Sequence, residues 1–176
     1  MPEHSLDVGI LVARRKLSGP WADYAWLPHG VLPAVPATAP GTRLGGDDGD
    51  GIFYAGAATL RLHASETAHY RDNLASGRPA LWVVLQPVAG DAYEVASVTA
   101  DPYEGEALTQ GNGEIVEAVP MPTEIRETIA EFVAAFHVER PFTKRRRDRA
   151  DPEALARGMP DAAGPPLPKR RREDGA

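Results

Sequence analysis

Apolar or small residues recur at every second position along the segment GIFYAGAATLRLH, residues 51–63. This period of two is the spacing of side chains on one face of a β-strand. The segment LDVGILVA at residues 6–13 repeats the pattern with Leu6, Val8, Ile10 and Val12. Strands with one apolar face must be covered on that face, so the chain is constrained to form a sheet with a second layer packed against it.

Further elements follow from the same kind of pattern. We expect extended segments over residues 24–32, 81–85, 92–100 and 114–119, the middle two forming a hairpin, and short helical stretches near residues 65–76 and 101–112. The clearest helix lies at the end of the patterned region, where one stripe contains Ile125, Ile129, Phe132, Val133 and Phe136. The predicted fold class is α+β: an antiparallel, strongly bent sheet or partial barrel covered by a C-terminal amphipathic helix.

Charge and proline content change near residue 142. Residues 1–142 carry 9 Lys and Arg against 19 Asp and Glu, whereas residues 143–176 carry 10 against 6. Apolar residues in the second part are too sparse to offset the entropy of ordering it. We therefore expect a single α+β domain over residues 1–142, with a mobile loop at 33–50, and a disordered basic tail over 143–176.

Motifs for catalysis and metal binding are missing from the sequence. There is no cysteine, and the five histidines show no short ligand spacing such as HxH or HxxxH. The acidic stretch GGDDGDG lacks the glutamate of a calcium loop, and no serine stands in a GxSxG context. For His69 we expect a surface pair with Asp72. We predict no catalytic residues, no metal and no cofactor, leave cofactor-binding residues unassigned, and expect a protein that is not an enzyme.

The sequence contains no membrane-spanning pattern. The apolar run at residues 8–13 is too short for a signal peptide, and no segment approaches about 20 apolar residues. We expect a soluble, cytoplasmic protein.

An aromatic group follows a basic run in the segment RRKLSGPWADYAW, residues 14–26. Such rings either fill a sheet face or present a partner-binding patch, because Trp, Tyr and Arg are enriched where binding energy is concentrated. The two KRRR runs of the tail indicate either a solvated tail or a segment that docks to an acidic partner protein, an anionic membrane or nucleic acid. Nucleic acid is an unfavourable partner because the body is acidic. The candidate partner-binding residues are Arg14, Arg15, Lys16, Trp21, Tyr24, Trp26, Lys144, Arg145, Arg146 and Arg147.

Several of these stretches together resemble a known family. They are VGILVARRKLSGPWADYAWLPHGVLP, LRLHASETAHYRDNL, LWVVL, DPYEGEA, EIVEAVPMP and FVAAFHVERPFTKRRR. Over about residues 7–147 the chain resembles a small proteobacterial family of uncharacterised function that is encoded beside formate dehydrogenase genes. Members are sometimes labelled molybdopterin-guanine dinucleotide biosynthesis proteins. The glycine-rich LAGGxSxRMG motif of such nucleotidyltransferases has no counterpart in VGILVARRKLSGP.

The resemblance implies a setting but no catalytic residues. It implies a non-catalytic accessory or maturation factor for a molybdenum or tungsten formate dehydrogenase, acting by binding that enzyme or its assembly proteins. The alternative is a protein that makes or carries the molybdenum cofactor, molybdopterin-guanine dinucleotide.

Overall fold

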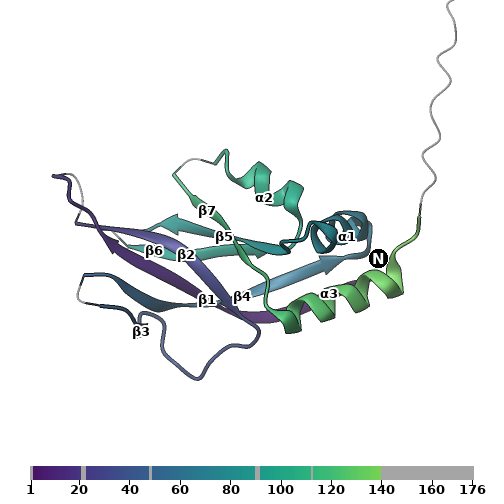
Figure 1. The fold of residues 1–176 in the computed structure, drawn as a ribbon, viewed down its shortest axis with the longest axis horizontal. Helices are drawn as coiled ribbons and strands as arrows, with labels where there is room; N and C mark the ends of the chain where they lie inside the picture. Colours follow the sequence, from purple (N-terminus) through teal and green to yellow (C-terminus); the bar gives the residue numbers. More distant parts are fainter. Residues whose placement is uncertain (1, 21–22, 48, 90–91, 112, 140–176) are drawn as a thin grey trace, which may run out of the picture. The chain divides into compact units, whose positions relative to one another are not determined.

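A computed structural model describes residues 2–20, 23–47, 49–89, 92–111 and 113–139 of the 176-residue chain (Figure 1). The expected disordered tail lies outside these residues. The described elements are β1 (Glu3–Lys16), β2 (Tyr24–Leu32), β3 (Arg43–Gly45), β4 (Gly51–His63), the 3-10 turn η1 (Ala64–Glu66), α1 (Thr67–Ala75), β5 (Ala80–Pro87), β6 (Tyr93–Thr99), α2 (Pro102–Leu108), β7 (Ile115–Pro120) and α3 (Thr123–Phe136). This mixture of helices and antiparallel strands confirms the α+β class.

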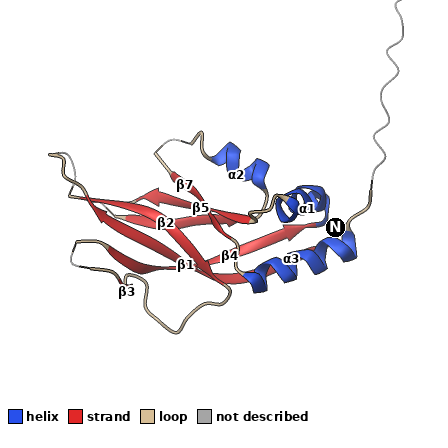
Figure 2. Ribbon diagram, in the orientation of Figure 1, coloured by secondary structure: helices blue, strands red, loops and turns tan. Residues whose placement is uncertain are grey.

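Within the described residues, the strands divide between two antiparallel sheets (Figure 2). The first has the strand order β2-β1-β4-β3, and the second has the order β6-β5-β7. The sequence led us to expect one strongly bent sheet or partial barrel. In the structure β2 contacts β7 and β4 contacts β6, but no ladder joins them and neither sheet closes. The division arises because η1 and α1 carry the chain away from the first sheet before β5 begins.

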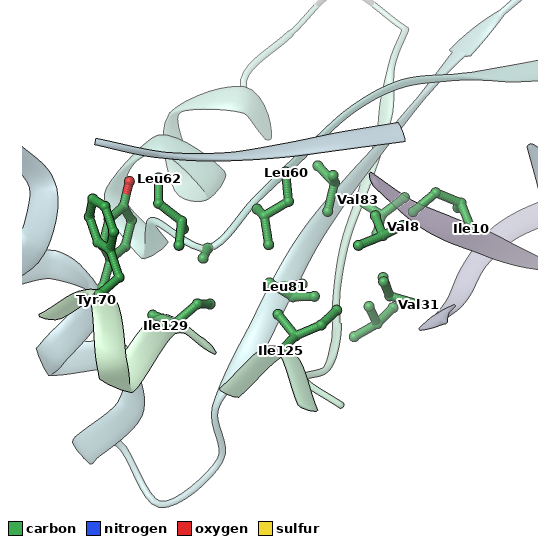
Figure 3. Packing of buried hydrophobic residues seen from close by; sticks show 14 of the residues in the cluster. Val8, Ile10, Val31, Leu60, Leu62, Tyr70, Leu81, Val83, Ile125 and Ile129 are labelled. Carbon is green, nitrogen blue, oxygen red and sulfur yellow. The ribbon is translucent and has the colours of Figure 1, made fainter. Parts of the chain in front are cut away.

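The core lies between the two sheets and is covered by α3 (Figure 3). Ile125 and Ile129 of α3 are buried against apolar side chains of β1, β4 and β5, among them Val8, Leu60 and Leu81. Each such side chain contributes about 1.5–3 kcal/mol when fully buried. The predicted helical stripe is correct as far as Val133, which is partly buried, whereas Phe136 is 41% exposed. The helix thus covers the core with its first three turns.

The segment 33–50, expected to be a mobile loop, contains β3 and pairs with β4. Arg43 stands opposite Phe53 in the ladder, and the Gly41 amide donates to the Tyr54 carbonyl at 2.7 Å. The mobility of the segment remains a prediction.

No helix in the described ranges is long and apolar enough to cross a membrane.

Candidate functional site

Arg14 lies near the end of β1 and is surrounded by aromatic rings. It stands opposite Trp26 in the ladder with β2. Its guanidinium carbon is 4.4 Å from the ring centroid of Tyr24, 5.0 Å from that of Phe53 and 5.9 Å from that of Trp26. Positive charge at these distances is attracted to the ring faces. We call these four residues the Arg14 cluster.

Hydrogen bonding of Arg14 is incomplete. The side chain is half-buried, and its Nε atom is enclosed and has no hydrogen-bond partner within the part of the chain that the structure describes. Among the described residues, no carboxylate forms an ion pair with it. A buried donor left unsatisfied costs about 1–3 kcal/mol, and more when the group is charged. The cluster therefore holds a cation whose charge is balanced by no carboxylate of the described residues.

An apolar cleft of about 210 Å³ opens beside the Arg14 cluster. Trp26 and Phe53 belong to both, and their rings meet edge to face with centroids 5.3 Å apart. We call this hollow the apolar cleft; it is lined by Val12, Trp26, Gly41, Phe53, Tyr54, Ala55, Leu85, Ala92 and Tyr93. The lining residues come from both sheets, so the cleft lies where the two sheets meet. Helix α3 lies beside the start of β1 (Figure 1), where Phe132 meets His4. The cleft lies farther along β1, at Val12.

A shift in strand register explains how Phe53 reaches the cluster. Strict alternation along β4 places Phe53 on the face opposite Leu60 and Leu62. The ladder with β1 skips Ala55, because Ile10 pairs with Gly56 and Leu11 with Tyr54. Such a bulge moves the side chains on one side of it to the other face. Phe53 consequently packs against the core together with Trp26.

The structure brings together only some of the residues predicted from the sequence. Arg14, Tyr24 and Trp26 are in contact, whereas Arg15 and Lys16 are exposed and belong to no part of the cluster. Trp21 and the tail residues Lys144, Arg145, Arg146 and Arg147 lie outside the described residues. Phe53 and Tyr93 were not predicted. A partner-binding role for Phe53, for Tyr93 or for any of the predicted residues is a proposal.

A second polar cluster joins α1 to the start of α2. The His69 Nδ1 atom is 2.7 Å from Oδ2 of Asp101 and 3.1 Å from Oε2 of Glu66. Asp101 is buried and caps α2, since its Oδ1 atom accepts from the Tyr103 amide at 2.8 Å. The sequence suggested Asp72 as the partner of His69, but the main partner is Asp101.

The geometry of this cluster favours a proton bound to the imidazole of His69. Glu66, His69 and Asp101 each place a potential ligand atom within 4.8 Å of the others. Both carboxylates, however, converge on the same ring nitrogen, and 2.7 Å is the length of a charged hydrogen bond. The hydrogen bond to Asp101 raises the pKa of His69 above 6.5, against the opposing effect of burial. The arrangement favours a protonated imidazole that holds two helices together.

Comparison with known proteins places the chain in a family. The family described as "Protein of unknown function (DUF3305)" matches residues 7–146. The chain belongs to the DUF3305 family. No curated protein matches it, and no solved structure does so either. In this DUF3305 protein, the Arg14 cluster and the apolar cleft lie side by side and share Trp26 and Phe53.

Proposed function

We propose that this DUF3305 protein is a non-catalytic accessory factor that binds a partner protein at the apolar cleft. The observation that carries the proposal is the Arg14 cluster, in which Arg14 and Tyr24 lie next to two rings, Trp26 and Phe53, that line the apolar cleft. These residue types dominate the binding energy of protein interfaces. The partner we propose is a molybdenum or tungsten formate dehydrogenase or one of its assembly proteins in the cytoplasm, on the strength of the resemblance over residues 7–147. The basic run Lys144–Arg147 is a proposed second contact.

Two hollows in the described part of the chain are poorly suited to a molybdenum cofactor, which supports protein binding instead. The apolar cleft, about 210 Å³, falls below the roughly 300–1,000 Å³ of ordinary small-molecule sites. A wider hollow of about 500 Å³ near α2 contains Arg78, but Asp72 and Glu106 line it as well. Two carboxylates beside one arginine oppose the binding of a pyrophosphate group.

Loss of the gene tests the proposal in the cell. We expect extracts of a strain lacking this gene to lose formate dehydrogenase activity, and the wild-type gene to restore it. Complementation with Trp26→Ala is expected to fail, and the purified variant no longer copurifies with the enzyme or its assembly proteins. Arg15→Gln is the matched control, because Arg15 is exposed and lies one residue from the cluster. Circular dichroism of Trp26→Ala checks that the domain remains folded. Unchanged activity in the deletion strain would overturn the assignment to formate dehydrogenase.

A further inference from the structure

We propose that the apolar cleft recognises a partner segment in which an apolar side chain stands next to a carboxylate. The apolar group enters the cleft, and the carboxylate pairs with Arg14. This inference rests on the proposed function, since it specifies the chemistry of the segment bound at the same site. It adds a charge requirement that a purely hydrophobic contact would not have.

The dimensions of the cleft limit what enters it. Its volume of about 210 Å³ is too small for most ligands of the size of a cofactor. None of the described lining residues carries a formal charge, and the lining includes Val12, Trp26, Phe53 and Leu85. An aromatic ring or a branched aliphatic side chain gains hydrophobic free energy there, and an aromatic ring also gains edge-to-face contact with Trp26 and Phe53. The occupant is therefore a single apolar side chain.

Arg14 supplies the charge preference. Arg14 is not one of the described residues that line the cleft, but its guanidinium carbon is 5.9 Å from the ring centroid of Trp26 and 5.0 Å from that of Phe53, and both rings line the cleft. A carboxylate next to the side chain in the cleft therefore extends past these rings toward the cation. Arg14 forms no ion pair with a carboxylate of the described residues, and a carboxylate is the acceptor that matches the planar fork of an arginine. A single such cation suits a singly charged anion. The acidic balance of residues 1–142 opposes a doubly charged phosphate.

A matched pair of small probes tests the inference on the full chain. N-acetylphenylalanine carries the ring and the carboxylate, whereas N-acetylphenylalanine amide carries the ring without the charge. Binding is followed by the shift of the Trp26 indole N–H resonance, assigned with the Trp26→Phe variant. We expect the acid to bind about tenfold more tightly than the amide, the ratio that one charge-assisted hydrogen bond supplies.

Substitutions then test whether Arg14 causes the preference for the acid. In Arg14→Gln, affinity for the acid is expected to fall to that of the amide, and affinity for the amide to stay unchanged. Arg15→Gln keeps the preference, because that side chain is exposed and lies outside the cluster. Arg14→Lys provides a second variant, which keeps the charge if the glutamine variant does not fold, and it is expected to retain a reduced preference for the acid.

Three results would overturn the inference: equal binding of acid and amide, failure of both to shift the Trp26 resonance, or a preference that survives in Arg14→Gln. These results are separable from failure of the proposed function. If the acid and the amide bind equally but Trp26→Ala no longer copurifies with the partner, the carboxylate requirement is wrong and the accessory role stands. If the protein prefers the acid but never associates with formate dehydrogenase, the proposed partner is wrong and the proposed recognition of an apolar group beside a carboxylate stands.

Discussion

His69 couples the packing of two helices to pH. Its imidazole bridges α1 to Asp101, the capping residue of α2, and the hydrogen bond to Asp101 raises its pKa above 6.5. A proton bound more tightly in the folded chain than in the unfolded chain stabilises the fold. This contribution is fully present below pH 6.5, the value of the unfolded chain, and is lost as pH rises through the higher pKa of the folded state.

The free energy of unfolding, measured in urea at several pH values from about 5.5 to about 8.5, tests this contribution of His69. We expect the difference between the native chain and His69→Gln to be largest at low pH and to shrink as pH rises. His29→Gln is the control, because His29 is exposed on β2. A difference that is the same at every pH would contradict the charged hydrogen bond. Because the imidazole is 36% exposed, the whole effect is expected to be modest.

At the residue scale, sequence reasoning found clusters that are local and missed those that depend on distant pairing. Tyr24 and Trp26 stand two positions apart on one strand, so their shared face followed from alternation. His69 and Asp101 are separated by 32 positions and meet only because α1 packs near the start of α2. Phe53 was not predicted because the bulge at Ala55, which turns it toward Trp26, leaves no trace in the apolar pattern.

At the scale of elements, the contact between α2 and β5 depends on a glycine. Gly105 is buried in α2, and a Cβ atom there would lie only 2.5 Å from Cδ1 of Trp82. Alanine gains roughly 1 kcal/mol of helix propensity over glycine. Overpacking costs about 1–3 kcal/mol, and a separation this short places the cost at the upper end. The clash therefore outweighs the propensity.

We accordingly expect Gly105→Ala to lower the free energy of unfolding by about 1–2 kcal/mol in urea titrations. Gly45→Ala is the matched control, since a Cβ atom at Gly45 meets nothing within 4 Å. Equal stability of Gly105→Ala and the native chain would show that Trp82 moves aside without penalty.

The elements themselves were largely predictable, and their arrangement was not. Alternation marked β1 and β4, and the helical stripe marked α3, because each pattern reflects one buried face. An alternating pattern states which face of a strand is buried but not which strand lies next to it. The structure alone therefore shows that β1 pairs with β4, although β2 and β3 lie between them in the sequence. It alone also shows that the strands form two sheets.

At the scale of the whole molecule, the distribution of the core predicts where the chain can be shortened. In the described part of the chain, the main cluster of buried apolar residues runs from Val8 to Phe132. We expect a chain ending at Phe142 to keep the near-ultraviolet spectrum of the full chain and a melting temperature within about 2 °C of it. A clear loss of stability would mean that residues beyond 142 take part in the folded domain, and the predicted boundary would then be wrong.

A chain ending at Pro122 is the informative contrast, because it lacks α3. It loses Ile125, Ile129 and Phe132, all buried in the core cluster. At about 1.5–3 kcal/mol for each side chain, this loss amounts to roughly 5–9 kcal/mol. Single domains are stable by only about 5–15 kcal/mol, so the shorter chain is expected to lose its cooperative melting transition. If it still melts cooperatively, the two sheets form a core without α3, and the helix has some role other than covering that core.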